Sequence, residues 1–269
     1  KQLAVATDGS SVAVVGQRDG RLLTGRLSPR GKLLAPLEDR GAALPGERSE
    51  LVYDGASYWF LVWDRVGAKL RVVRFDATLS PLGAAAEVAL PQGAFSGAAR
   101  YGHGAVLLVA YGNQRFHSAR WDVSAGAPSA WQLLTGIGHP PEVARIRDGW
   151  LLVFGVPSPS NAGRTNIGWQ RIDTMGAAVG SPQAIDLLHL APLSVTGMLQ
   201  LCTLEGGEAA ATYDAVGAVI QFLATGAPVL ASNGFPASTS RTGAPPWGAT
   251  AGDLPAWVVS QLNQGPTKP

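Results

Sequence analysis

A repeated motif at the end of short apolar runs constrains the fold of this chain more than any single residue does. At four places an arginine and an apolar residue close such a run just before a turn, and a fifth copy is degenerate. The copies are Arg26-Leu27-Ser28, Arg74-Phe75-Asp76, Arg120-Trp121-Asp122, Arg171-Ile172-Asp173 and Gln221-Phe222-Leu223. Recurrence at a nearly constant interval predicts an array of similar structural units.

Turn glycines mark the same units independently. They stand at positions 9, 55, 104, 149, 207 and 252, so the intervals are 46, 49, 45, 58 and 45 residues. Asp-Gly and Gly-Gly pairs suit tight hairpin turns, because glycine adopts positive φ at little cost. The short apolar runs that follow the glycines predict buried strands at 12–15, 59–63, 105–110, 150–154, 209–213 and 256–259.

Each unit contains three further strand patterns. The arginine motif ends a third strand, and a weaker fourth strand follows it, as at 86–90 and 131–134. An inner strand is expected before each turn glycine, at 3–7, 51–53, 98–101, 143–146 and 198–203. Four antiparallel strands in about 45 residues are typical of a β-propeller blade. We therefore expect an all-β fold, a β-propeller of four-stranded antiparallel blades in a single domain, without helices of ten or more residues.

The glycine intervals also set the expected blade boundaries. The repeats are predicted at 1–46, 47–95, 96–139, 140–193, 194–242 and, as a partial copy, 243–269. Six blades are favoured, because the last hairpin keeps the interval and begins a new copy. The alternative is a five-bladed ring that these last strands close.

The best copies resemble the repeats of secreted bacterial β-propeller proteins. Blades of that family read approximately DG-x-x-(F/Y)-L-V-V-W, followed by a strand that ends R-V-D-x-x-G. Residues 54–63 and 171–176 match this pattern best, whereas the fifth unit lacks the arginine and the aspartate. The resemblance covers most of residues 1–226 and implies an extracytoplasmic location, secreted, periplasmic or on the outer cell surface. It implies no particular activity.

Composition argues against several classes of partner. Charged residues make up 15% of the chain, the net charge is +2, and no run of Lys or Arg occurs, so nucleic acid is not an expected partner. No apolar stretch reaches the roughly 18 residues of a membrane span. Cys202 is the single cysteine, which rules out an intrachain disulfide. The chain begins at Lys1 rather than Met, which fits a processed N-terminus and is compatible with the removal of a signal peptide.

The titratable residues predict neither a metal nor a cofactor. The four histidines have no short paired spacing, and no calcium loop, nucleophile elbow or phosphate-binding glycine loop occurs. Asp8, Asp54, Asp148 and Glu205 recur next to the turns, which favours a role in turn formation over catalysis.

The repeated arginine has two interpretations. A ring of guanidinium groups could present positive charge to an anionic partner. Alternatively, each arginine could cover apolar surface with its stem and pair with a nearby aspartate or a neighbouring blade. Recurrence in four units, away from the inner strands, favours the structural role.

The inner strands supply a candidate ligand site. Arg100 and Arg145 each stand four residues before a turn glycine, which predicts equivalent positions in adjacent blades. Two neighbouring arginines in this arrangement could bind a carboxylate or sulfate in a bidentate fashion. Counting in the same way places Val5 and Leu51 at those positions in the first two blades. Aromatic side chains near the same strands could stack on a sugar. The candidate ligand-binding residues are Arg100, Arg145, Tyr53, Tyr101 and Trp247.

These patterns favour a non-catalytic binding or scaffold module that recognises a protein or glycan through its propeller loops. One alternative is a carbohydrate-active enzyme or lectin with a site at the mouth of the central channel. Another is a subunit of a larger surface assembly, joined through the edge of the incomplete last blade.

Overall fold

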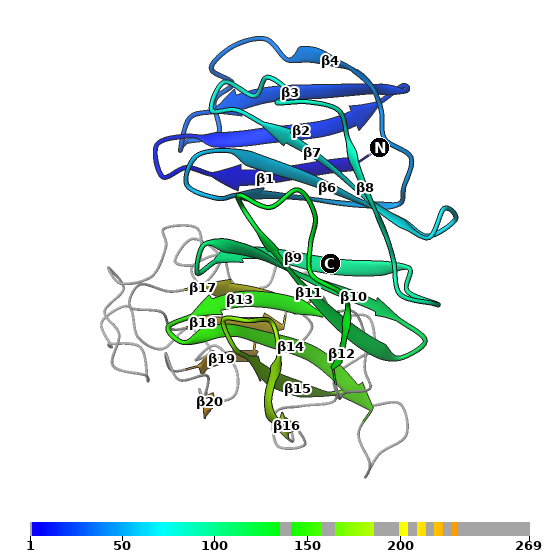
Figure 1. The fold of residues 1–269 in the computed structure, drawn as a ribbon. Helices are drawn as coiled ribbons and strands as arrows, with labels where there is room; N and C mark the ends of the chain where they lie inside the picture. The colour runs from blue at the N-terminus through cyan, green and yellow to red at the C-terminus, as the bar shows by residue number, and fades with distance from the viewer. Residues whose placement is uncertain are drawn as a thin grey trace, which may run out of the picture. The chain divides into compact units, whose positions relative to one another are not determined.

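The computed structural model describes residues 2–134, 141–157, 165–185, 199–203, 209–213, 218–222 and 228–230. All regular elements in these residues are strands, and they form five four-stranded sheets (Figure 1). Within each sheet the strands follow chain order, and all the pairings between them that are described are antiparallel. We call these sheets blades 1 to 5.

The first three blades lie between residues 2 and 134. Blade 1 consists of β1 (Gln2–Thr7), β2 (Val12–Arg18), β3 (Arg21–Leu27) and β4 (Glu38–Ala42). Blade 2 consists of β5 (Arg48–Tyr53), β6 (Tyr58–Asp64), β7 (Lys69–Phe75) and β8 (Ala86–Ala89). Blade 3 consists of β9 (Ser96–Gly102), β10 (Ala105–Gly112), β11 (Arg115–Asp122) and β12 (Gln132–Leu134).

The remaining strands form blades 4 and 5. Blade 4 consists of β13 (Glu142–Ile146), β14 (Gly149–Pro157), β15 (Thr165–Ile172) and β16 (Ala178–Ile185). Blade 5 consists of β17 (Leu199–Thr203), β18 (Ala209–Tyr213), β19 (Ala218–Phe222) and β20 (Pro228–Leu230). The predicted partial repeat at 243–269 lies outside the described residues, so the choice between six and five blades stays a prediction.

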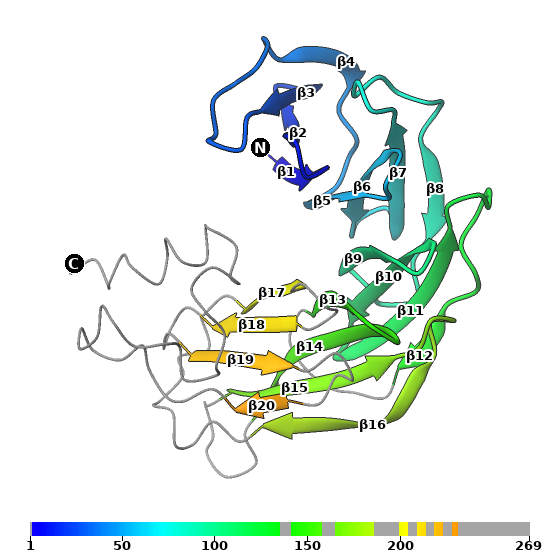
Figure 2. The same ribbon diagram turned by 90° about the vertical axis from the view of Figure 1, so that its left-hand side faces the viewer.

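The chain divides into two compact units. Unit 1 comprises residues 1–141 and 172–179, and unit 2 comprises residues 142–171 and 180–269. In unit 1 the first strands of successive blades are neighbours, with β5 next to both β1 and β9 (Figure 2). In unit 2 β13 is likewise next to β17. Four-stranded antiparallel blades that meet through their first strands are the arrangement of a β-propeller, so the predicted fold class is confirmed.

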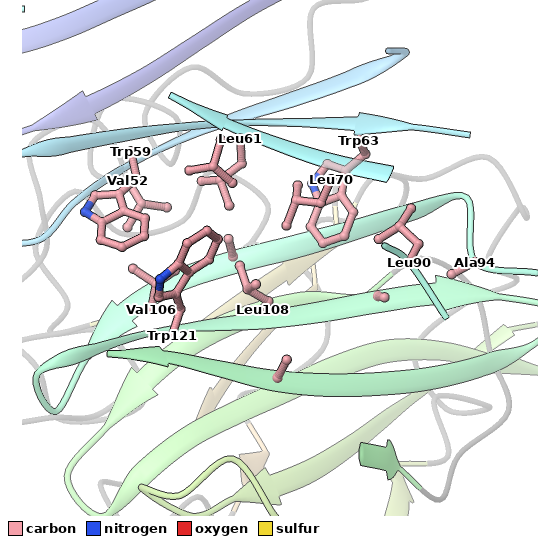
Figure 3. Packing of buried hydrophobic residues seen from close by; sticks show 14 residues of the cluster. Val52, Trp59, Leu61, Trp63, Leu70, Leu90, Ala94, Val106, Leu108 and Trp121 are labelled. Carbon is pink, nitrogen blue, oxygen red and sulfur yellow. The ribbon is translucent and has the colours of Figure 1, made fainter. Parts of the chain in front are cut away.

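Two apolar clusters hold the blades of unit 1 together. All residues of β6 and β10 are buried, and β6 contributes its alternate residues to an apolar cluster on each of its two faces. One cluster joins blades 1 and 2 around Phe60 and Phe75. The other joins blades 2 and 3, where the rings of Trp59 and Trp121 meet edge to face with centroids 5.2 Å apart (Figure 3). Continuous apolar runs in the sequence therefore became the packed interior between blades.

Candidate functional site

The turns between the first two strands of each blade fix which inner-strand residues are equivalent. In blades 1 and 2 the ladder continues beyond the strands, because Asp8 N donates to Ser11 O (3.3 Å) and Asp54 N donates to Ser57 O (3.0 Å). In blades 3 and 4 the last pairs are Gly102–Ala105 and Ile146–Gly149. The two-residue turns are therefore Gly9-Ser10, Gly55-Ala56, His103-Gly104 and Arg147-Asp148.

The turn glycine occupies a different place in different blades. Gly9 (φ 89°) and Gly55 (φ 96°) are first in their turns. In blade 3 His103 (φ 52°) comes first and Gly104 (φ 74°) second, both with the positive φ of a type I′ hairpin. Gly149 follows its turn and begins β14. Counting back a fixed number of residues from the glycine thus reaches non-equivalent positions.

This shift corrects one premise of the predicted arginine pair. Counted from the last ladder pair, Arg100 lies in the third pair, opposite Leu107, whereas Arg145 lies in the second, opposite Trp150. Successive strand residues point to opposite faces of a sheet. The prediction that the two arginines occupy equivalent positions is therefore wrong. Arg100 belongs to unit 1 and is half-buried, and Arg145 belongs to unit 2 and is exposed.

The second pair, which we call the turn-proximal position, instead groups two of the predicted aromatic residues. By register it holds Thr7, Tyr53, Tyr101 and Arg145. Tyr53 is half-buried, donates its hydroxyl to Gly55 O at 2.9 Å, and packs on the Tyr58 ring with centroids 4.7 Å apart. Tyr101 is half-buried against the cluster between blades 2 and 3. Trp247, the fifth predicted residue, lies outside the described residues.

The fifth pair carries two glutamates that the sequence analysis missed. Glu50 lies opposite Leu61 in blade 2, and Glu142 lies opposite Val153 in blade 4. Blades 1 and 3 have alanines there, Ala4 and Ala98. The predicted inner strands began at 51 and 143, one residue after each glutamate. Extending the strands to the five to seven residues that they span in the structure would have included both.

Glu50 links two first strands through its carboxylate. Its Oε2 accepts a hydrogen bond from Ala99 N of β9 at 2.6 Å, and its Oε1 lies 3.0 Å from Nη2 of Arg48. The side chain is 19% exposed. Glu50 thus combines a fixed position on an inner strand with access to solvent, which a carboxylate needs in order to meet a substrate.

Asp8 and Asp54, by contrast, already accept several hydrogen bonds from their own turns and from neighbouring strands. Asp54 accepts from Trp59 Nε1 (2.7 Å), Ser57 Oγ (2.7 Å) and backbone N–H groups. Burial acts to raise the pKa of Asp54, but these donors outweigh it and hold the pKa below its usual range. Hydrogen bonds from Arg26 and from Ser11 hold the pKa of Asp8 well below its usual range. Both groups stay ionised and serve the turns.

Two of the repeated arginines, Arg26 and Arg74, join successive blades. Arg26 lies 2.9 Å from Oδ2 of Asp8 and donates to the carbonyl of Ala77 in blade 2. Arg74 lies over the Trp59 ring at 4.5 Å and donates to the carbonyl of Val123 in blade 3 at 3.2 Å. These contacts confirm the structural interpretation for these two arginines. Arg120 pairs within its own blade, 2.6 Å from Oδ1 of Asp122.

The described residues provide no group of three or more His, Cys, Asp or Glu side chains that could hold a metal ion. They also contain no helix with the length and apolar character needed to cross a bilayer. The side chain of Cys202 and the residues Glu205 and His189 lie outside what the structure describes.

Comparisons with known proteins show the fold. No family model matches the chain, and no curated protein matches it. Similar solved structures include Kuenenia stuttgartiensis hydrazine synthase (TM-score 0.54, 14% identity), a bifunctional GH43-CE protein of Bacteroides eggerthii (0.53, 12%) and the xyloglucan PUL GH43B of Bacteroides ovatus (0.52, 13%). The match covers 85%, 86% and 87% of this chain, but 64%, 34% and 54% of theirs. The chain therefore spans less than two thirds of each of these proteins.

These structures overturn the prediction of a non-catalytic binding or scaffold module. Two of the three are GH43 glycoside hydrolases, which agrees with the alternative of a carbohydrate-active protein and not with the main prediction. At 12–14% identity the likeness itself concerns the β-propeller fold.

Proposed function

We propose that this protein is a carbohydrate-active enzyme whose site lies on the first strands of blades 2 and 3, β5 and β9. The observation that carries the proposal is the fold shared with two GH43 proteins, taken together with Glu50 of β5, its bond to Ala99 N of β9, and Tyr101 of β9. Because hydrazine synthase has a similar fold, the fold alone does not determine the reaction. The side chains on the first strands carry the argument beyond the fold.

Glycoside hydrolysis needs carboxylates at the scissile bond, one to protonate the leaving oxygen and one to act as base or nucleophile. Glu50 is the carboxylate that we assign to one of these two roles in unit 1. Glu142 is its register equivalent in unit 2 and is assigned independently. The contact with Ala99 N fixes the orientation of the Glu50 carboxylate. Orientation of this kind lowers the barrier to reaction by holding the group near its reactive geometry.

The tyrosines at the turn-proximal position suit a sugar ligand. Sugar rings expose C–H groups on one face, and these pack on aromatic rings. The hydroxyl of Tyr53 is already bonded to Gly55 O, so its ring is held in place. A glycan is therefore the proposed partner, and the resemblance to secreted bacterial repeats supports a location outside the cytoplasm.

The proposal is tested by release of reducing ends from a panel of plant and microbial polysaccharides. We expect activity on at least one of them, and an about 10³-fold lower kcat for Glu50→Gln, the order of loss typical for an acid or base. Glutamine keeps an acceptor for Ala99 N, so the melting temperature should change little. Glu87→Gln, which alters an exposed glutamate of the outer strand β8, is the matched control and should keep full activity.

Two outcomes would contradict the proposal. Lack of activity on the whole panel would argue against a carbohydrate-active enzyme. Full activity of Glu50→Gln would remove this residue from the site and leave Glu142→Gln as the next variant.

A further inference from the structure

The loop between β3 and β4 of blade 1 combines exposed leucines with cations. Leu33, Leu34 and Leu37 are 44%, 57% and 51% exposed. Arg30 and Lys32 stand immediately before them, and every residue from 29 to 39 is exposed. Single exposed leucines are common on protein surfaces, whereas a cluster of three exposed leucines within five residues is typical of an interaction surface.

The loop has a defined conformation that places Leu33 and Leu37 on one face of blade 1. Gly31 N donates to Ser28 O (2.8 Å), and Leu34 N donates to Arg26 O (2.9 Å). A Cβ at Gly25 of β3 would lie 2.5 Å from Cδ2 of Leu37 and 3.6 Å from Cδ1 of Leu33. The missing side chain of Gly25 therefore lets these two leucines lie side by side over β3.

The cations of the loop carry net positive charge. Arg30 and Lys32 form no ion pair with the described residues. The acids that follow are neutralised, because Asp39 pairs with Arg21 and Glu38 pairs with Arg40. The segment from 28 to 37 contains no acidic residue.

The corresponding loops of the other described blades lack this combination. In blade 2, Leu82 N donates to Arg74 O, as Leu34 N donates to Arg26 O in blade 1. Leu82 is also exposed (57%), but residues 76–85 contain no cation and Leu79 is buried. Residues 122–130 of blade 3 contain neither a leucine nor a cation. Of these three blades, only blade 1 combines exposed leucines with cations in this loop.

We propose that this loop, which we call the leucine loop (residues 28–37), binds the surface of a negatively charged lipid bilayer. Leucines gain free energy by entering the boundary between headgroups and acyl chains, and nearby cations are attracted to anionic headgroups. A polysaccharide would explain the cations but would leave the leucines in water. An acidic lipid surface accounts for both, since it offers apolar depth next to negative charge.

The test is sedimentation of the full chain with unilamellar vesicles. Vesicles of phosphatidylcholine with about a quarter phosphatidylglycerol should bind the protein, more weakly at high salt, while pure phosphatidylcholine should bind it several-fold less. Leu34→Ser/Leu37→Ser should lower the partition coefficient about tenfold. Arg30→Gln/Lys32→Gln should lower binding to the anionic vesicles by at least about tenfold and remove the salt dependence. Leu82→Ser is the matched control and should bind like the wild type.

Three results would overturn the proposal. One is no binding to anionic vesicles. Another is binding that both loop variants retain. The third is self-association that Leu34→Ser/Leu37→Ser abolishes without any vesicle binding, which would make a second copy of the chain the occupant. Arg30→Gln/Lys32→Gln alters only exposed side chains that form no ion pair within the described part of the chain, so we expect this variant to fold normally. It therefore tests the proposal even if Leu34→Ser/Leu37→Ser folds poorly. No arm of this test depends on carbohydrate activity.

Discussion

At the scale of single residues, the turn aspartates show how ionised groups are used inside the blades. The carboxylate of Asp54 is buried, yet it meets an indole N–H, a hydroxyl and two backbone N–H groups. A buried charge is tolerated when hydrogen bonds of this number replace its hydration. Asp8 is similarly bonded, and its partner Tyr58 has its pKa raised to about 12 by burial and by the hydrogen bond to Asp8. These acids belong to the framework that positions the first strands.

This framework predicts acid sensitivity. Because the folded-state pKa of Asp54 lies below the ordinary value of 3.8, its contribution to stability is present above that value and is lost as the pH falls through the folded pKa. Asp54→Asn should lower the free energy of unfolding at pH 7 by about 2 kcal/mol. It should also reduce the loss of stability on acidification. Urea unfolding followed by tryptophan fluorescence at neutral and acid pH measures both effects, and equal acid sensitivity in the two proteins would contradict the assignment.

At the scale of elements, close packing between successive blades depends on a glycine. A Cβ at Gly97 of β9 would lie 2.3 Å from Cη2 of Trp63 and 2.4 Å from Val109 O. The Trp63 ring is fully buried in the cluster between blades 2 and 3, so it has no free space to move into. The approach of β9 to β6 therefore requires the absence of a side chain at this position.

Gly97→Ala should consequently destabilise the protein by about 3 kcal/mol, at the upper end of the usual effect of overpacking. Gly83 is the matched control. No heavy atom lies within 4 Å of a Cβ placed there, so Gly83→Ala should change the free energy of unfolding by less than about 0.5 kcal/mol. Chemical denaturation of the two variants measures both changes in the free energy of unfolding. Equal stabilities would show that β9 can shift away from Trp63 at no cost.

The elements also show how far the sequence alone leads. Strand positions followed from apolar runs, because β6 and β10 are buried on both faces and leave a clear pattern. Register did not follow, because a hairpin can place its glycine first, second or after the turn, as Gly55, Gly104 and Gly149 do. An error of one residue exchanges the faces of a strand. Such an error made Arg100 and Arg145 look equivalent and hid the equivalence of Tyr53 with Tyr101.

The candidate carboxylates were missed for a related reason. Glu50 and Glu142 stand at or near the starts of their strands, where polar residues in a sequence read as loop. Their equivalence becomes visible only from the pairing of β5 with β6 and of β13 with β14, and this pairing is known only from the three-dimensional structure. Sequence periodicity could predict the blades but not which polar residues the blades align.

At the scale of the whole molecule, the fold leaves the chemistry to a few side chains. Similar structures include a hydrazine synthase and two GH43 proteins, so one architecture serves different reactions. The proposed activity therefore depends on Glu50 and Tyr101, and the proposed lipid contact depends on the leucine loop. Glu50 is not required by blade architecture, since blades 1 and 3 have alanine at its position.

The crystal structure of the Glu50→Gln variant with an oligosaccharide cut from the most responsive polysaccharide would test the central claim most directly. We predict a sugar ring packed on Tyr101, and a glycosidic oxygen within hydrogen-bond distance of the side chain at position 50. An oligosaccharide bound on the outer strands, such as β4 or β8, with position 50 remote from it, would contradict the assignment of the site.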